Sequence, residues 1–236
     1  MNATRVVLAQ IGCGYWGPNL LRAFSGLPAC TVKWVADPRP ERQEYVRTGF
    51  PQVAATPSWR QAVEDPEVRA VVVATPAASH LELARAALLS GKHVLVEKPL
   101  AMSVAEVDEL TRLAGARGLV LMAGHTFLYN AAVRCTRELI AGGELGGLYY
   151  LYSQRLNLGQ VRSDVNVWWN LAPHDVSILL YLLSGERPRT VSARGVAYLQ
   201  PGIEDVVFAL LRWQNGITAH VHVSWLDPGK VRRVTV

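Results

Sequence analysis

The sequence feature that most constrains the fold is an apolar run that stops abruptly at three spaced glycines. The run covers residues 6–11, and the glycines that follow it are Gly12, Gly14 and Gly17. Such a run is typical of a parallel strand that is buried on both faces. Pro18 comes next, at the start of the predicted helix. The first N–H groups of a helix have no partner within the helix, so proline is tolerated there. The predicted order is therefore strand, glycine turn and helix.

Each glycine has a separate steric role in a turn that holds a dinucleotide pyrophosphate against the N-terminus of a helix. Gly12 allows the tight turn, Gly14 lets the backbone approach the phosphates, and Gly17 lets the helix pack closely on the strand. The motif alone is also compatible with a glycine-rich turn that binds nothing. Tyr15 and Trp16 lie inside the turn, so we place them with the three glycines in a predicted cofactor site.

A second strand favours the nucleotide interpretation. Residues 31–36 form another apolar run that ends in Asp37, about 20 residues after the turn, where a ribose-binding acid is expected. A carboxylate there can accept hydrogen bonds from a ribose 2′-hydroxyl but repels a 2′-phosphate, which predicts NAD rather than NADP. Arg39 is a complication, since a guanidinium two residues further on could bind that phosphate. The predicted cofactor is therefore NAD, with NADP left possible.

The composition suits a folded soluble protein. The chain has 236 residues, of which 50% are hydrophobic, and no apolar stretch approaches the roughly 20 residues needed to cross a bilayer. Its start contains no signal-like apolar region, so cytoplasmic residence is expected. The net charge is +5, from 24 Lys and Arg against 19 Asp and Glu, but the basic residues are scattered. This distribution favours anionic small molecules as ligands over nucleic acid, and no membrane partner is expected.

The cysteines and histidines do not predict a metal site. Cys13, Cys30 and Cys135 lack the spacing of metal ligands, and we expect reduced thiols, with Cys13 a small filler of the glycine turn rather than a redox switch. His220 and His222 share one face of a predicted strand, but no third ligand is evident, so we interpret them as ordinary strand residues.

Strands and helices alternate along the first half of the chain. Apolar strands are predicted at residues 68–74, 93–96 and 119–122, and helices at residues 41–48, 58–63 and 79–89. Ser103 starts a further helix, with Glu106 three residues later as a capping box. This alternation predicts an α/β fold with a doubly wound parallel sheet and ligands at the carboxyl ends of its strands. Residues 1–123 are therefore predicted to form one nucleotide-binding Rossmann domain.

The pattern changes in residues 124–236. Helices are predicted at 131–141 and 172–183, and strands at 148–156, 190–199, 205–213, 217–225 and 231–236. The dipeptide Asn215-Gly216 predicts a hairpin between two of these strands. We therefore expect an α+β domain with a mostly antiparallel open sheet and helices on one face.

Three further motifs complete a family pattern. Thr75-Pro76 follows the strand at 68–74, His80 lies early in the next helix, and Glu97-Lys98-Pro99 follows the strand at 93–96. With the glycine turn and Asp37, these residues resemble the glucose-fructose oxidoreductase / inositol dehydrogenase (Gfo/Idh/MocA) family of NAD(P)-dependent sugar oxidoreductases. The resemblance covers essentially the whole chain, and the Glu-Lys-Pro tripeptide is its most specific feature.

The resemblance implies roles for these residues. Lys98 is expected to face both substrate and nicotinamide and to act in catalysis, where the alternative is a surface lysine at a strand end. Thr75, Pro76, His80 and Glu97 are expected to lie around the cofactor.

The family also carries a histidine at the start of the long helix of the second domain, and His174 matches it. Asn170 stands where the family commonly has an aspartate, which makes a carboxylate-assisted relay doubtful. An ordinary lysine has a pKa of about 10.4 and is a poor base near neutrality, whereas imidazole, with a pKa of about 6.5, suits proton transfer. We therefore favour His174 as the base and Lys98 as a hydrogen-bond donor to the substrate oxygen. Lys98 as the base is the alternative.

Residues 124–130 and 153–159 look most like family members that act on nucleotide-linked amino sugars, including UDP-N-acetylglucosamine 3-dehydrogenases. The resemblance therefore implies hydride transfer at a ring hydroxyl of such a hexose, with C3 as the expected position. Guanidinium groups can bind phosphate bidentately. The predicted substrate-binding residues are Lys98, Arg155, Asn157, Arg162, Asn170 and His174. The alternatives are an inositol or free-sugar dehydrogenase and a cofactor-binding protein without turnover.

Family members continue well beyond the point where this chain stops. We therefore expect the second domain to be incomplete at its C-terminus. The resemblance also implies a homo-oligomer formed through the C-terminal sheet. The aromatic cluster at residues 149–152 and 168–169 is expected to serve sheet packing or a subunit interface.

Overall fold

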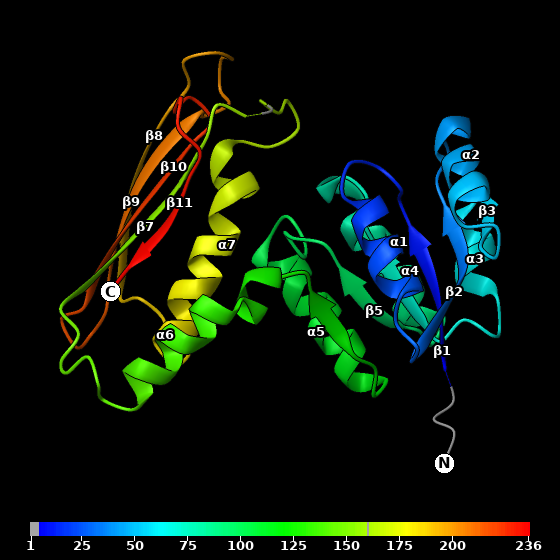
Figure 1. Cartoon of the computed structure of the whole chain (residues 1–236), viewed down its shortest axis with the longest axis horizontal. Helices are drawn as coiled ribbons and strands as arrows, with labels where there is room; N and C mark the ends of the chain where they lie inside the picture. Colours follow the sequence, from blue (N-terminus) through cyan, green and yellow to red (C-terminus); the bar gives the residue numbers. More distant parts are fainter. Residues whose placement is uncertain (1–4, 160) are drawn as a thin grey trace. The chain divides into compact units, whose positions relative to one another are not determined.

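The computed structural model of the protein describes residues 5–159 and 161–236. The chain forms two compact units, and the boundary between them lies between Gly124 and His125. Figure 1 shows the chain coloured from its N-terminus to its C-terminus. Each unit has its own sheet and its own apolar core, so each is described by itself.

The first unit is built around a six-stranded parallel sheet with the strand order β3-β2-β1-β4-β5-β6. Its strands are β1 (Val6–Ile11), β2 (Cys30–Ala36), β3 (Ala54–Thr56), β4 (Ala70–Val73), β5 (His93–Val96) and β6 (Leu121–Ala123). Its helices are α1 (Gly17–Ser25), α2 (Pro40–Gly49), α3 (Trp59–Glu64), α4 (His80–Leu89) and α5 (Val104–Ala116), with a short 3₁₀ turn, η1 (Ala77–Ser79), before α4. This confirms the predicted doubly wound Rossmann sheet.

Two apolar cores cover the two faces of this sheet. On one face, Ala9 and Ile11 of β1 pack with residues of α3, α4 and α5. On the other face, Leu8 of β1 packs with Leu21 of α1 and Val46 of α2. Successive side chains of a strand point to opposite faces, so β1 supplies both cores. This is why its sequence is almost continuously apolar.

The loops that carry the predicted cofactor residues leave the carboxyl ends of neighbouring strands. Gly12 follows β1, Asp37 follows β2, Thr75 comes after β4 and Glu97 follows β5. The strand order reverses between β1 and β4, and ligands of open α/β sheets bind at such a point. The sheet therefore gathers these loops at one of its edges.

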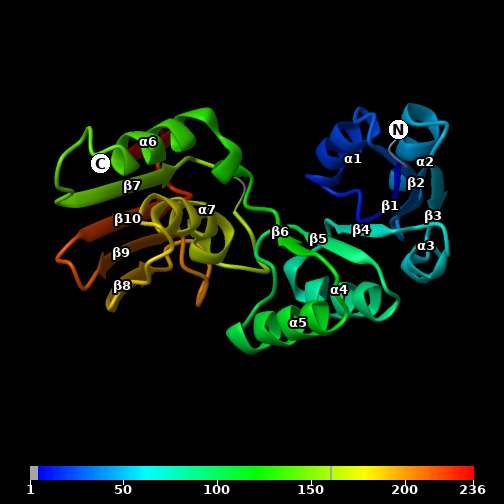
Figure 2. The same ribbon diagram turned by 90° about the horizontal axis from the view of Figure 1, so that it is seen from below.

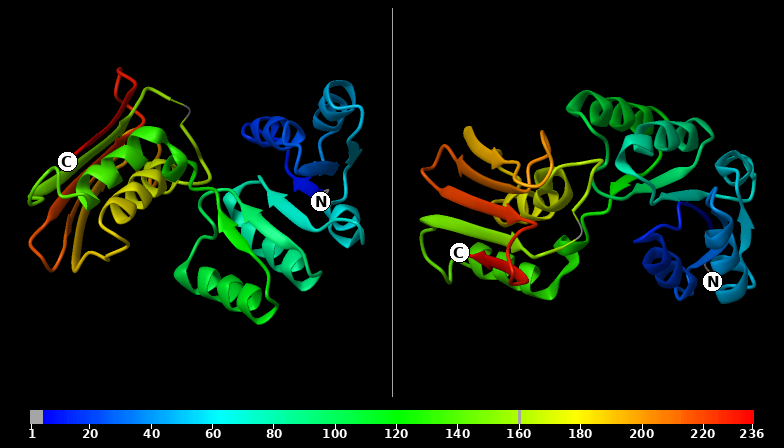
Figure 3. Two further views of the ribbon diagram at one scale, coloured as in Figure 1. Left: turned by 60° about the horizontal axis from the view of Figure 1, so that its bottom comes forward. Right: turned by 90° about the horizontal axis from the view of Figure 1, so that it is seen from above.

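The second unit is built around a five-stranded sheet with the order β11-β7-β10-β9-β8. Its strands are β7 (Tyr150–Leu156), β8 (Thr190–Val196), β9 (Val206–Arg212), β10 (Thr218–Ser224) and β11 (Val231–Thr235), and its helices are α6 (Ala131–Ala141) and α7 (Val167–Leu182), after a 3₁₀ turn, η2 (Thr126–Tyr129). Among the neighbouring strands described for this sheet, β7 and β10 pair in parallel and the other pairs are antiparallel. Helices α6 and α7 lie together on one face of the sheet (Figures 2 and 3). The predicted, mostly antiparallel open sheet is thereby confirmed.

Helix α7 begins at Val167, earlier than the expected start at residue 172. The cap is Asn166, whose side-chain oxygen accepts a hydrogen bond of 3.1 Å from the Trp169 N–H. Pro173 lies inside the helix, where it removes one backbone hydrogen bond and would ordinarily end the helix. Burial of the sheet-facing side of α7, including Leu179, offsets this loss. His174 is therefore an interior helix residue and not a helix-start residue, which corrects the sequence-based expectation.

Strand β3 was not expected from the sequence, because its 3 residues are too few for a periodic signal. Among the described helices of both units, none is long and apolar enough to span a membrane.

Candidate active site

The glycine turn has the steric properties expected of a phosphate-binding turn. Gly12 has a φ of +92°, and a Cβ atom on it would lie 2.4 Å from the Ala74 carbonyl oxygen. A Cβ atom on Gly17 would lie 2.6 Å from the carbonyl oxygen of Gly12. For Gly14 the nearest atom to a Cβ is Nη2 of Arg39, at 3.6 Å. Gly12 and Gly17 are thus needed for the fold of the turn, whereas Gly14 leaves its backbone open to a ligand.

Gln10 fixes the turn from inside the strand, a role that the sequence interpretation missed. Its side chain is buried, and Nε2 donates hydrogen bonds to the carbonyl oxygens of Gly12 at 2.9 Å and Gly17 at 3.0 Å. These two bonds tie the start of the turn to the start of α1. The available signal was a polar residue in an otherwise apolar run, since a buried amide requires partners.

Asp37 is buried and surrounded by donors. It accepts hydrogen bonds from the N–H of Cys13 at 2.8 Å and from the Arg39 guanidinium, through Nε at 2.9 Å and Nη2 at 2.8 Å. Burial acts to raise the pKa of Asp37, but the bonds from Arg39 and Cys13 outweigh it and lower the pKa. Asp37 is therefore a carboxylate at neutral pH that is already paired with a cation.

Cys13 is fully buried within the turn, and burial together with the charge of Asp37 raises the pKa of its thiol. A thiol of this kind is a poor nucleophile, which agrees with the filler role expected for it. Cys13, Cys30 and Cys135 are all outside disulfides.

His80 joins two loops of the site. Its ring is 1% exposed, with Nδ1 2.7 Å from the carbonyl oxygen of Pro99 and Nε2 3.0 Å from that of Thr75. A neutral imidazole can donate from only one of these nitrogens. The Ser79 hydroxyl adds hydrogen bonds to Thr75 Oγ1 at 2.7 Å and to the carbonyl oxygen of Pro76 at 2.8 Å. His80 thus braces the loops after β4 and β5.

Glu97 places a partly buried carboxyl group beside the glycine turn. The N–H of Lys98 donates to Glu97 Oε2 at 3.2 Å, and a Cβ on Gly124 would lie 3.1 Å from the carboxyl carbon. Burial raises the pKa of Glu97, and hydrogen bonds from Lys98 N–H and Trp16 oppose the rise. Oε1 is buried without a hydrogen-bond partner among the described residues.

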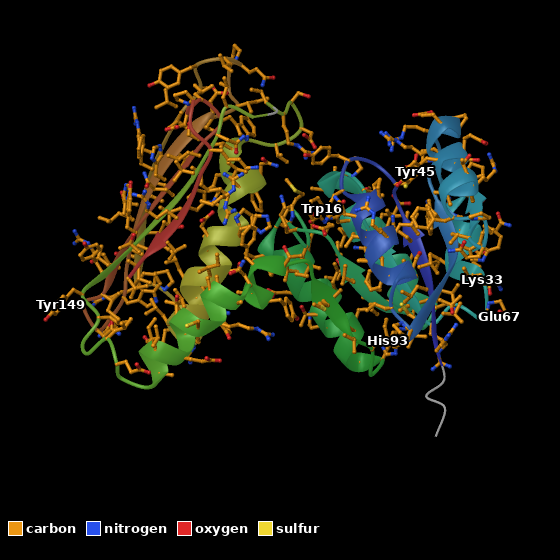
Figure 4. All side chains as sticks on the ribbon, in the orientation of Figure 1. Trp16, Lys33, Tyr45, Glu67, His93 and Tyr149 are labelled. Carbon is orange, nitrogen blue, oxygen red and sulfur yellow. The ribbon has the colours of Figure 1, made fainter. Side chains whose placement is uncertain are left out.

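The turn and the Glu97 segment fit a dinucleotide. Gly14 leaves room for a phosphate, and the unpartnered Oε1 of Glu97 can accept a hydrogen bond from a ligand donor. Tyr15 is 88% exposed and Trp16 46% exposed at the same turn, and Figure 4 marks the position of Trp16. These exposed rings can cover a bound nucleotide.

In the second unit, α7 carries Asn170 and His174 four residues apart, and therefore on one face of the helix. The indole N–H of Trp225 donates to Asn170 Oδ1 at 3.2 Å. This hydrogen bond sets the orientation of the Asn170 amide, with its oxygen toward Trp225. The carbonyl oxygen of His174 accepts a hydrogen bond of 2.8 Å from the Ser177 hydroxyl.

Arg155 is buried against α7 and not exposed in a loop. Its Nε donates to Oδ2 of Asp175 at 2.6 Å, and Ser153 Oγ donates to Oδ1 of the same carboxylate at 2.6 Å. The guanidinium carbon lies 4.3 Å from the ring centroid of Phe127, and that ring meets the imidazole of His174 edge-on at 4.8 Å between centroids. Sequence reasoning missed Phe127 and Asp175, although an acidic residue in an apolar helix indicates a buried partner.

The other predicted substrate residues lie between β7 and α7 in this unit. Asn157 follows β7, and its Oδ1 accepts a hydrogen bond of 3.0 Å from Nη2 of Arg232. Arg162 is partly exposed and pairs with Asp164 at 2.6 Å. The first unit thus gathers the predicted cofactor residues, while α7 and β7 gather His174, Asn170 and Arg155. Within the described ranges, His, Cys, Asp and Glu form no group of three or more that could hold a metal ion.

Two family models match the chain. The model described as "Oxidoreductase family, NAD-binding Rossmann fold" matches residues 6–125. The model described as "GFO/IDH/MocA C-terminal domain" matches residues 133–236. Together they cover nearly all of the sequence.

The chain is 33% identical over 176 residues to the 1,5-anhydro-D-fructose reductase of Ensifer adhaerens and 34% identical over 171 residues to the UDP-N-acetylglucosamine 3-dehydrogenase of Acidithiobacillus ferrooxidans. These matches cover 70% and 72% of this chain and 53% of each relative. The chain therefore spans about half the length of these curated relatives. The crystal structure of GenD2 from gentamicin A biosynthesis in complex with NAD has a TM-score of 0.91 at 26% identity, over 98% of this chain and 71% of that one.

Proposed function

Because the chain belongs to the GFO/IDH/MocA family of NAD-binding oxidoreductases, we propose that its protein transfers hydride between nicotinamide and a ring carbon of a sugar. The observation that carries this proposal is the position of the Glu97-Lys98 segment. It follows β5 at the carboxyl edge of the Rossmann sheet, and Trp16 of the glycine turn hydrogen-bonds to Glu97. A catalytic lysine there would lie beside the nicotinamide of a cofactor whose pyrophosphate is bound at Gly12–Gly17.

Oxidation of a secondary alcohol needs a hydride acceptor at the carbon and a base for the hydroxyl proton. NAD supplies the hydride acceptor when it is bound. Lys98 donates a hydrogen bond from Nζ to the substrate oxygen and stabilises the negative charge that develops there. His174 accepts the hydroxyl proton on its imidazole, because histidine is the side chain most often used for proton transfer near neutrality.

We propose a nucleotide-linked hexose as the substrate, oxidised at C3. Support comes from the likeness of residues 124–130 and 153–159 to nucleotide-sugar enzymes and from the relative named UDP-N-acetylglucosamine 3-dehydrogenase. The relative named 1,5-anhydro-D-fructose reductase supports the competing class of free sugars. Asn157, Asn170 and Arg162 stay in the proposed substrate site.

A thermal-shift screen tests this proposal, because a ligand that binds the native state raises the unfolding temperature. NAD should raise it alone, and UDP-N-acetylglucosamine should raise it further in the presence of NAD. A further rise with free inositol or glucose, together with no response to UDP-sugars, would contradict the proposed substrate class.

One observation favours a second candidate function, a cofactor-binding protein without turnover. Asn170 occupies the position where the family commonly has an aspartate, and an amide cannot accept a proton as a carboxylate can. This alternative predicts a rise in unfolding temperature with NAD and no hydride transfer with any sugar.

We further propose that the protein is a homo-oligomer that associates through the face of its five-stranded sheet not covered by α6 and α7. Support comes from large side chains on that face, including Phe208, which is 43% exposed, and Tyr150, which is 60% exposed. Exposed apolar patches of this kind are typical of protein interfaces.

A further inference from the structure

A chain of side-chain contacts leads from Asp175 through Arg155 and Phe127 to the proposed proton acceptor. The carboxylate of Asp175 binds Arg155 Nε at 2.6 Å, and the Arg155 guanidinium lies 4.3 Å from the centroid of the Phe127 ring. The same ring meets the imidazole of His174 at a centroid distance of 4.8 Å and an interplanar angle of 60°. Asp175 directly follows His174 in α7. Three elements of one unit, α7, β7 and η2, therefore meet at these four residues.

Arg155 is poorly placed to bind the phosphate of a substrate directly. It is 4% exposed, and both Nε and Nη2 point to Asp175, at 2.6 Å and 3.4 Å. The guanidinium carbon also lies over the ring of Phe127, 4.3 Å from its centroid. Ser153, on the same face of β7, donates to Asp175 Oδ1 at 2.6 Å and so completes the pairing of that carboxylate. A buried, paired guanidinium of this kind has a fixed orientation.

We propose that Arg155 is a positioning residue for His174 and acts through Phe127. The inference rests on the proposed role of His174 as proton acceptor. Helix α7 fixes the Cα of His174, and the orientation of the ring about its side-chain bonds depends on the groups that the ring contacts, of which Phe127 is one. The contact with Phe127 restricts the orientation of the imidazole, and the guanidinium of Arg155 holds the Phe127 ring in place by cation–π attraction. Asp175 in turn locks Arg155 to the helix that carries the histidine.

Steady-state kinetics of the complete enzyme separate positioning from direct substrate binding. Arg155→Met keeps an apolar stem but removes the planar cation, so kcat should fall about 10- to 100-fold while KM stays nearly constant, since a misplaced catalytic group costs rate and not affinity. The kcat of Arg155→Lys should fall less than that of Arg155→Met, because lysine keeps the positive charge. A large rise in KM with kcat preserved would overturn the proposal and make Arg155 a phosphate ligand.

Phe127→Leu is a second variant that interrupts the contacts between Arg155 and His174, and it keeps the proposal testable if Arg155→Met fails to fold. It should reproduce the loss of kcat, and the double variant should lose little more than either single variant, because both changes break one chain of contacts. Full additivity of the two losses would overturn the proposal.

NMR of the imidazole of His174 gives a readout that does not depend on turnover. Its signals, identified by their loss in His174→Asn, should shift in Arg155→Met because the Phe127 ring moves relative to the imidazole. They should also shift in Phe127→Leu because the ring current is lost. Arg137→Met is the matched control, since this exposed guanidinium of α6 contacts Ser184 instead. Unchanged His174 signals in both test variants would overturn the inference. If the signals shift in the test variants but the His174→Asn variant keeps full activity, the contacts are supported. In that case only the proposed role of His174 as proton acceptor is refuted.

Discussion

Asp37 sets both the shape and the charge of the predicted adenine-ribose site. Its carboxylate holds the glycine turn through Cys13 N–H and binds the Arg39 guanidinium through both oxygens. Arg39 is 47% exposed at its side chain, so a ligand can reach it and draw it away from Asp37. The NAD preference inferred from a lone acidic residue thus depends on a pair of opposite charges.

Cofactor selectivity should respond to both members of this pair. The unaltered chain is expected to bind NAD more tightly than NADP, because the Asp37 carboxylate repels a 2′-phosphate. Asp37→Ser should move the ratio of dissociation constants towards NADP by about 10-fold or more, since it releases Arg39 to bind the phosphate. Arg39→Ala in the same background should cancel that gain. Titration by calorimetry would measure these constants, and equal affinity of the unaltered chain for NAD and NADP would contradict the assignment.

Substitutions of Lys98 and His174 should impair different parts of the reaction. Lys98→Met should remove stabilisation of the alkoxide, and His174→Asn should remove proton transfer, a role typically worth about 10² to 10⁴ in rate. Both variants should still bind NAD, because backbone groups of the glycine turn hold the pyrophosphate. The acidic limb of the wild-type pH–rate profile should vanish in His174→Asn and persist in Lys98→Met. The reverse pattern would make Lys98 the base.

At the scale of elements, a charged clamp joins β2 to the turn before β4. Asp65 Oδ2 accepts hydrogen bonds of 2.7 Å from both Lys33 Nζ and Trp34 Nε1. Lys33 also approaches Glu67 at 3.1 Å, and Figure 4 shows the two side chains together. The hydrogen bond from Lys33 is the largest of the effects that lower the pKa of Asp65 from 3.8 to about 2. The clamp lies at the end of the sheet opposite the glycine turn.

The clamp gives a defined pH dependence of stability. A carboxyl group whose pKa is lower in the folded state stabilises the fold above its unfolded value of 3.8, and the effect disappears as the pH falls through the folded value. Asp65→Asn should therefore lower the unfolding temperature near pH 7, and only modestly, because solvent screens the partly exposed Lys33. The difference from wild type should close as the pH approaches 2. Glu67→Gln, at the exposed partner, should change little at any pH, and a pH-independent gap for Asp65→Asn would contradict the account.

Local signals predicted most of the elements. Asn215-Gly216 forms the expected hairpin between β9 and β10, with a φ of +89° at Gly216. Ser103 caps α5 as expected by accepting from Glu106 N–H at 3.3 Å, while the Glu106 carboxylate accepts from Met102 N–H at 2.8 Å. These features depend on neighbours within a few residues, which a single sequence displays directly.

The parts that sequence reasoning missed depend on distant contacts. The helix was expected to start at residue 172, and burial against the sheet explains why α7 begins earlier and runs through Pro173. Arg155 carries the same guanidinium whether it meets a phosphate or Asp175, and its partner lies 20 residues away in the chain. Composition and periodicity carry no signal for such pairings, so the role of a buried cation must be read from the fold.

At the scale of the whole molecule, the uncovered face of the five-stranded sheet carries a stack of rings. His222 lies 4.2 Å from Phe208 between ring centroids, and His220 lies 5.1 Å from Tyr152. Burial lowers the pKa of His222, and the charge of His220 acts in the same direction. The charged form of His222 is therefore disfavoured, which suits an apolar contact between copies of the protein.

Phe208→Asp should break such an assembly, because a buried carboxylate without a partner is unfavourable at an interface. Light scattering with size-exclusion chromatography should report a lower molar mass for this variant than for the wild type. Tyr149→Asp is the control, since Tyr149 is 85% exposed and projects from the turn before β7 (Figure 4). A wild-type protein that runs as a monomer, or a Phe208→Asp variant of unchanged mass, would contradict association through this face.

The most direct test of the central claim is hydride transfer itself, measured in a complete enzyme that contains this chain. The rate at which NAD is reduced to NADH should be measured with UDP-N-acetylglucosamine and, in parallel, with free N-acetylglucosamine and inositol. We predict reduction of NAD with the UDP-sugar, a ketone at C3 of the product, and loss of the rate in Lys98→Met by about 10² or more. Binding of NAD without reduction by any of these substrates, or reduction that survives in Lys98→Met, would contradict the claim that this site is an NAD-dependent sugar dehydrogenase.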